Sequence, residues 1–214
     1  VIDGVAGGDI RTLAPQDIES MTILKDAASA AIYGTRGANG VILVTTKKGQ
    51  GEPGKPVITY DSYFAVNLHK DRPEVLDADE WRRSRRGNDY GASTDWYDEL
   101  MRDFSYDPNQ YLSIDGNTPN GYYSASINYK HATGLDIVSA REEFGGRAAV
   151  QQLVLDKHLQ LTMTLNARKV KEDWGNSGMF DTALGMNPTM PIYNEDGSFY
   201  QPTSPTDAKN PVSE

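Results

Sequence analysis

The sequence contains no cysteine and only three histidines. Without thiols the chain can form neither a disulfide framework nor a thiolate metal site, and it has no cysteine nucleophile. His69, His131 and His158 are far apart in the sequence and lack the spacing of metal ligands. The sequence therefore predicts no metal centre.

Long apolar runs and an excess of basic residues are also missing. No run of about 18 apolar residues is present, which excludes a membrane-spanning helix, and no charged-then-apolar leader marks a signal peptide. The formal net charge is −9, with 30 acidic and 21 basic residues. This balance argues against a nucleic-acid-binding surface. The first 50 residues carry as many bases as acids, so the acidic excess lies further along the chain.

Residues 23–49 read as a strand, a short helix, a glycine-rich turn and a second strand. Asp26 is placed to cap a helix over residues 27–33, and Gly34 to end that helix in the left-handed conformation. Val41–Thr46 is a nearly continuous β-branched run, typical of a strand covered on both faces. Phosphate-binding glycines lie between a strand and the start of a helix, whereas these follow a helix. We interpret them as turn residues and predict no nucleotide or other cofactor.

Alternating polar and apolar residues dominate the chain after residue 56. Three glycines and two prolines lie within residues 49–56, which predicts a linker. Val57–Leu68 then alternates over twelve residues, and four further segments follow, at residues 111–116, 123–130, 143–154 and 159–168. Soluble sandwiches use strands of about 5–6 residues and membrane barrels about 9–11, so the longer segments favour a barrel.

The two faces of these predicted strands differ in polarity. Between residues 159 and 167 the odd positions are Leu, Leu, Met, Leu and Ala, and the even positions are Gln, Thr, Thr and Asn. We expect the odd face to meet lipid. The same reasoning places Ile127 toward lipid and Ser126 toward the lumen.

The predicted connections alternate in length. Residues 115–121 and 156–158 are short turns, whereas residues 71–107, residues 131–142 and the chain from residue 171 are long. In outer-membrane barrels the long loops face outward, where substrate or a surface partner would be met.

Two helices are predicted within the first long loop. Asp77 can cap the first helix, Glu80 can complete a capping box, and Gly87 can end it. Residues 94–102 read as the second helix.

Candidate ligand contacts are few. We expect Trp81 and Trp96 to pack the loop helices, and we regard Trp174 and Tyr193 as the better candidates for ligand binding. Asn194–Ser198 lacks the spaced ligands and distal Glu of a calcium loop, so it is predicted to be a hairpin turn.

No catalytic constellation is recognisable. Glu142 and Glu143 are adjacent, so in a strand their carboxylates point to opposite faces and cannot act on one bond. The sequence therefore predicts that this protein is not an enzyme.

Five short motifs follow one another within the first 42 residues. They are Val1–Val5 (VIDGV), Pro15–Ser20 (PQDIES), Ile23–Ser29 (ILKDAAS), Ala31–Gly34 (AIYG) and Arg36–Ile42 (RGANGVI). In this order they closely resemble the plug-domain signature of the SusC/RagA family of TonB-linked outer-membrane transporters. Trp96–Asp98 (WYD) and Pro191–Gly197 (PIYNEDG) are similar to the early barrel region of that family.

The resemblance implies an α+β fragment, in which a small α/β plug portion precedes antiparallel strands of an incomplete outer-membrane β-barrel. Residues 1–49 would be the C-terminal part of the plug, residues 50–56 the linker, and residues 57–214 the first strands and loops of the barrel. We expect the signal sequence, the TonB-contacting segment and most of the barrel to lie outside this sequence.

The resemblance also assigns a structural or gating role to a set of plug residues. They are Asp3, Gly4, Lys25, Asp26, Tyr33, Gly34, Arg36, Gly37, Asn39 and Gly40. Among them, Arg36 is the residue that we expect to form an ion pair between plug and barrel, because a charge facing a polar lumen can be paired and partly desolvated.

By resemblance, the complete protein would import an oligosaccharide or a peptide across the outer membrane of a Gram-negative bacterium. It would contact outer-membrane lipid, pair with a SusD-like surface lipoprotein and draw energy from TonB. The alternative is a soluble carbohydrate-binding β-sandwich with an α/β appendage.

Overall fold

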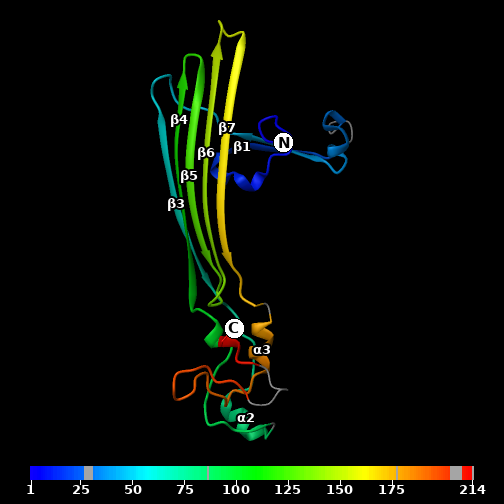
Figure 1. The fold of residues 1–214 in the computed structure, drawn as a ribbon, viewed down its shortest axis with the longest axis vertical. Coiled ribbons are helices and arrows are strands. Elements are labelled where there is room, and N and C mark those ends of the chain that lie inside the picture. The colour runs from blue at the N-terminus through cyan, green and yellow to red at the C-terminus, as the bar shows by residue number, and fades with distance from the viewer. Residues whose placement is uncertain (27–30, 86, 177, 203–208, 214) are drawn as a thin grey trace. The chain divides into compact units, whose positions relative to one another are not determined.

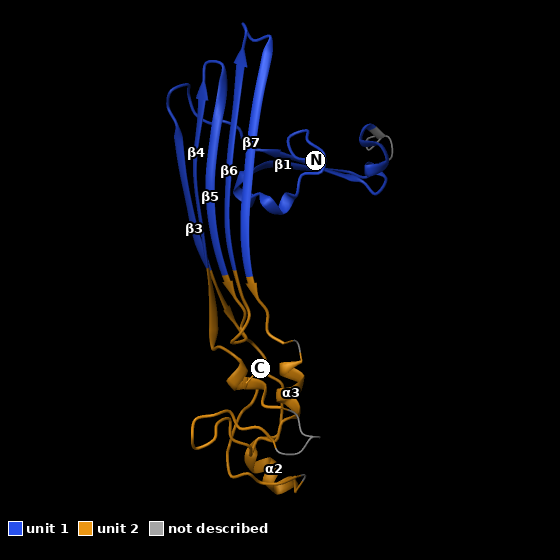
Figure 2. Ribbon diagram, viewed as in Figure 1, with its two compact units in different colours: residues 1–64, 108–131, 142–171 blue, residues 65–107, 132–141, 172–214 orange. Residues whose placement is uncertain are grey.

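Two β-sheets organise the chain in its computed structural model (Figure 1). The structure describes residues 1–26, 31–85, 87–176, 178–202 and 209–213. The chain divides into two compact units (Figure 2). Unit 1 comprises residues 1–64, 108–131 and 142–171, and unit 2 comprises residues 65–107, 132–141 and 172–214.

The smaller sheet pairs β1 (Ile18–Leu24) with β2 (Val41–Thr46) in antiparallel register. Two short 3₁₀ helices, η1 (Ile10–Thr12) and η2 (Pro15–Asp17), precede β1. The β2 strand has the predicted bounds, and its Val44 packs with buried Ile2 and Leu13. Ile42, however, is 47% exposed. The expectation that β2 is covered on both faces is therefore wrong for this residue.

The segment between β1 and β2 follows the predicted turn only in part. Residues 27–30, and with them most of the helix predicted from Asp26, lie outside the described residues. The 3₁₀ helix η3 (Ala31–Gly37) is interrupted at Gly34, where φ is 61° and ψ is −148°. The positive φ is as predicted, but this ψ belongs to a region open only to glycine rather than to the left-handed helical region. Gly40 also has a positive φ, 96°.

The larger sheet contains five strands in sequence order. They are β3 (Val57–Leu68), β4 (Phe104–Thr118), β5 (Gly121–Thr133), β6 (Ala140–Val154) and β7 (Leu159–Asp173). All five predicted strands are confirmed, and β3 has the predicted bounds. The strands are 12 to 15 residues long, as expected from the length of the alternating segments.

Some predicted loops are shorter than expected. β4 begins at Phe104 rather than near Tyr111, although it includes Pro108, which cannot donate a ladder hydrogen bond. β5 and β6 extend so far that only residues 134–139 connect them. The long loop predicted over residues 131–142 is therefore wrong. Residues 49–56 form no helix or strand, as predicted for the linker.

Unit 2 has its own apolar core. Its elements are α2 (Ala78–Ser84), η4 (Asp98–Leu100), α3 (Met179–Gly185) and η5 (Pro211–Ser213). Trp96 and Leu100 are 3% and 0% exposed and pack against methionines of α3 and the segment after it. The prediction that Trp96 packs the loop is confirmed. No helix in the described part of the chain is long and apolar enough to cross a membrane.

The loop helices differ from the sequence-based expectation at two places. The capping box between Asp77 and Glu80 is present, but Arg85, with φ 53°, and not Gly87, ends α2 in the left-handed conformation. The helix predicted over residues 94–102 is reduced to the three residues of η4. Thr94 Oγ1 donates to the Met190 carbonyl and Trp96 Nε1 to the Asn187 carbonyl. These tertiary bonds outweigh the weak local preference for helix.

Candidate functional site

The five-stranded sheet has one polar and one apolar face within unit 1. On β4 and β5, Ser113 pairs with Ser126 and Leu112 with Ile127. Both serines are buried, whereas Leu112 is 42% and Ile127 50% exposed. The alternation continues on β7, where Met163 is 73% exposed. The apolar face is the one predicted to meet lipid.

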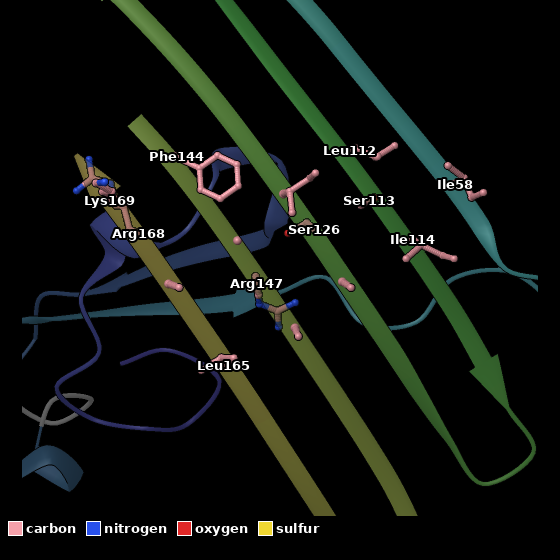
Figure 3. A pocket seen from close by; sticks show the side chains of 15 residues that line it. Ile58, Leu112, Ser113, Ile114, Ser126, Phe144, Arg147, Leu165, Arg168 and Lys169 are labelled. Carbon is pink, nitrogen blue, oxygen red and sulfur yellow. The ribbon is translucent and has the colours of Figure 1, made fainter. Parts of the chain in front are cut away.

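The apolar face contains a shallow hollow of about 740 Å³ (Figure 3). Its apolar lining side chains come from every strand of the sheet and include Ile58, Leu112, Ile127, Phe144 and Leu165. Gly146 and Ala148 lie among them and leave the surface low, because their side chains are small. Contact with lipid hydrocarbon chains would suit this surface, because exposing apolar surface to water is unfavourable.

On the polar face, Arg147 of β6 joins the sheet to residues 1–49. Its side chain is 3% exposed. The guanidinium Nη2 donates to Thr46 Oγ1 at 2.5 Å and lies 3.8 Å from Asp3 Oδ2. Asp3 in turn accepts from the Thr46 backbone N–H at 2.8 Å and from Thr46 Oγ1 at 2.6 Å. A buried guanidinium requires such partners, because desolvating an unpaired charge is costly.

A second polar contact lies between Tyr111 of β4 and Asp17 at the end of η2. The Tyr111 hydroxyl donates to Asp17 Oδ1 at 2.8 Å, and the two residues are 3% and 4% exposed. Asp17 also holds the chain just after β2, because its carbonyl accepts from the Lys47 N–H at 2.8 Å. We call the Arg147–Thr46–Asp3 and Tyr111–Asp17 contacts the two anchors.

A polar cavity of about 790 Å³ separates residues 1–48 from the inner faces of β6 and β7. Neutral side chains line it on the strands, namely Gln151, Gln160, Thr162, Thr164 and Asn166. The Asn166 Oδ1 atom is buried and has no hydrogen-bond partner among the described residues. Residues 1–48 thus contact β4 and β6 through the anchors and face β7 across this cavity.

The residues of the predicted plug signature are distributed over several places. Asp3 is part of an anchor, and Gly4 and Tyr33 line the polar cavity. Gly34, Arg36 and Gly40 line a separate hollow of about 650 Å³ together with Tyr33. Gly37 is buried, and Lys25, Asp26 and Asn39 are exposed.

The predicted ion pair of Arg36 is not formed within the described part of the chain, where Arg36 is exposed. Arg147 is the arginine that lies at the contact. Sequence reasoning missed it, although it is the one charged residue in the middle of the polar face of its predicted strand. The pairing of Arg36 stays a prediction.

The two predicted ligand-binding aromatics lie in unit 2 and are exposed. Trp174 is 71% exposed, and its Nε1 donates to Glu172 Oε2 at 3.3 Å. The Tyr193 ring lies 5.1 Å from the Phe199 ring, measured between centroids. The turn predicted at Asn194–Ser198, between Tyr193 and Phe199, is confirmed, since the Asn194 N–H donates to the Ser198 carbonyl. The described residues contain no group of His, Asp or Glu side chains able to hold a metal ion.

Comparison with known proteins gives a consistent set of relatives. No family model matches the chain. It is 33% identical over 99% of its length to TonB-dependent receptor P3 of Formosa agariphila, and 32% identical over 91% to TonB-dependent receptor SusC of Bacteroides thetaiotaomicron. The chain spans about a fifth of the length of these curated relatives.

A solved structure shares the fold. The RagAB peptide importer in its closed-closed state superposes on the whole of this chain with a TM-score of 0.76, at 18% identity, and the match covers 30% of that chain.

Proposed function

This chain belongs to the SusC/RagA family of TonB-dependent outer-membrane receptors of Gram-negative bacteria, and from that premise we propose that the complete protein actively imports a large nutrient. Residues 1–49 form part of the plug, residues 50–56 the linker, and residues 57–214 the first strands and loops of the barrel. The plug closes the lumen, and energy from TonB displaces it.

The observation that carries this proposal is the inverted polarity of the sheet. On the polar face, β4 and β6 contact residues 1–49 through the two anchors, and the apolar face is exposed. A plugged barrel in lipid has this arrangement, since its lumen is polar and its outer band is apolar. A soluble sandwich would instead bury its apolar face, which argues against the alternative function.

The nutrient is an oligosaccharide or a peptide, and the importer works with a SusD-like surface lipoprotein. SusC, the RagAB peptide importer and the likeness of this chain to both support this part of the proposal. The ten signature residues of the plug act in structure or gating.

Growth tests the proposal directly. A strain lacking the complete gene is grown on a panel of glycans and peptides as sole nutrients, beside a strain lacking TonB. We expect both strains to lose growth on the same nutrient. If the strain lacking the gene fails to grow on a nutrient on which the strain lacking TonB still grows, the proposed coupling to TonB is wrong. Extraction of the full-length protein only by detergent, and faster migration before heating than after, separates the barrel from the soluble sandwich.

A further inference from the structure

The acidic excess of the chain lies in unit 2. Its residue ranges contain 19 acidic and nine basic residues, a formal net charge of −10, whereas those of unit 1 contain 11 acidic and 12 basic residues. A negative surface of this size attracts cations and repels anions over about one Debye length.

Unit 2 also contains a pocket of about 660 Å³. Residues 74–78, the Trp81 side chain of α2, residues 93–97 and the end of α3 line it. Its apolar lining includes Val75, Leu76 and Leu184. The charged residues that line it, Glu74, Asp77 and Asp95, are all carboxylic acids. The pocket thus combines apolar walls with negative charge.

The three carboxylates differ in what already binds them. Asp77 caps α2 by accepting from the Glu80 N–H at 2.7 Å, and Asp95 pairs with Arg72. Glu74 is exposed and has neither a hydrogen bond nor an ion pair with any residue that the structure describes. Trp81 contributes to the wall of the pocket, and its indole Nε1 is buried without a partner in the described residues.

Two of the basic side chains near the pocket, those of Arg72 and Arg82, are already engaged by acidic residues. Arg82 pairs with Asp79 at 3.0 Å and with Asp89 at 3.1 Å. The backbone N–H of Gly91 and the Arg82 guanidinium lower the pKa of the Asp89 carboxyl, which therefore stays ionised. Arg72 lies between Asp95 and Asp98. Each of these two arginines is thus shared by two carboxylates.

We propose that this pocket binds a lysine or arginine side chain of a peptide substrate. The aliphatic stem would lie against Leu76, Leu184 and the Trp81 ring, and the cationic head would pair with Glu74. A neutral glycan offers no charge to this surface, and an acidic glycan would be repelled. The proposal rests on the import function above and narrows its substrate to peptides with basic residues.

Matched peptides test the charge preference. Binding of a short peptide with a central arginine to the full-length protein in detergent is measured by calorimetry, beside the same peptide with citrulline, which is neutral and nearly isosteric. We expect the arginine peptide to bind about fivefold tighter, as for one partly desolvated ion pair. Glu74→Gln should remove this difference. Glu99→Gln, which removes the same charge from an exposed site outside the pocket, should retain it.

A second variant places a competing cation in the pocket. Leu184 is 39% exposed, so the Leu184→Lys variant should fold. It should bind the arginine peptide more weakly and the citrulline peptide with unchanged affinity. Equal affinities for the two peptides in the unaltered protein would overturn the proposal. The proposal would also be overturned if the Glu74→Gln variant no longer bound the surface lipoprotein but still preferred the arginine peptide, because the pocket would then bind the lipoprotein. TonB-dependent growth on peptides tests import separately, since it can persist when the charge preference fails.

Discussion

In unit 1 the contact between the larger sheet and residues 1–49 is mainly polar and the opposite face of the sheet is apolar and exposed, whereas unit 2 has an apolar core. Arg147 and Asp17 are nearly inaccessible, and Met163 is 73% exposed. In unit 2 the apolar side chains of Trp96 and Leu100 are buried in a core, and the residues of the unit carry a net negative charge. Since burial of apolar surface is driven by water, the reversal indicates that the two units fold against different solvents. Loss of an apolar side chain should therefore be most harmful in the core of unit 2, and gain of a charge most harmful on the exposed apolar face of unit 1.

The largest effect is expected from the core of unit 2. Trp96→Ala removes a 3%-exposed indole and should destabilise this unit by about 3–5 kcal/mol, because a cavity remains. Limited proteolysis of the full-length protein would reveal the loosened loops. Trp174→Ala, at a 71%-exposed site, is the matched control and should change nothing. Equal protease resistance of both variants would mean that unit 2 has no water-driven core.

A slightly smaller effect is expected on the apolar face of unit 1. Met163→Arg should cost about 2–4 kcal/mol at the bilayer midplane and reduce assembly, whereas Thr162→Arg on the polar face should assemble. Heat-modifiable barrel in isolated outer membranes is the readout. Ile127→Arg tests a second strand in the same way. Its neighbour Ser126 is only 7% exposed, so arginine there would clash and is unsuitable as a control. If the Met163→Arg and Thr162→Arg variants assemble equally well, the apolar face does not meet lipid.

Substitutions at the anchors test the polar contact between the larger sheet and residues 1–49. Arg147→Met leaves Asp3 and Thr46 without their buried partner and should cost about 1–3 kcal/mol. We expect the plug to loosen, which is measured as entry of large antibiotics that the outer membrane normally excludes. Arg36→Met, at an exposed arginine, provides the comparison. A leakier Arg36→Met than Arg147→Met would restore Arg36 as the residue that joins plug and barrel.

The smallest effect concerns backbone geometry. Gly40→Val forces a β-branched residue to a φ of 96°, and its Cβ would lie 3.0 Å from the Leu24 carbonyl oxygen, so we expect a loss of about 1–2 kcal/mol. Gly34→Val should behave similarly. Gly185→Ala in unit 2 meets no atom within 4 Å and should be neutral or slightly stabilising. Transporter levels in the outer membrane provide the measurement, and equal levels for all three variants would contradict the assigned turn.

The strands were predictable because their signal is local. Alternation along the chain located all five strands of the larger sheet, and the bounds of β3 agree to the residue. Features that depend on distant residues escaped prediction. Thr94 and Trp96 are held out of a helix by carbonyls more than 90 residues away. Arg147 and Thr46 are separated by 101 residues, and no periodicity within one strand identifies such a partner.

The linker limits how far residues 1–46 can lie from the end of β4. Asn117, at the end of β4, donates from Nδ2 to the Gly51 carbonyl at 2.8 Å, and its own carbonyl accepts from the Gly54 N–H at 3.2 Å. Only four residues, 47–50, therefore connect the end of β2 to the first residue that Asn117 binds. Five Cα–Cα steps separate Thr46 from Gly51, so the fully extended segment spans at most about 18 Å. If residues 1–46 move away from β4 during transport, a displacement beyond this distance would first require the hydrogen bonds of Asn117 to break.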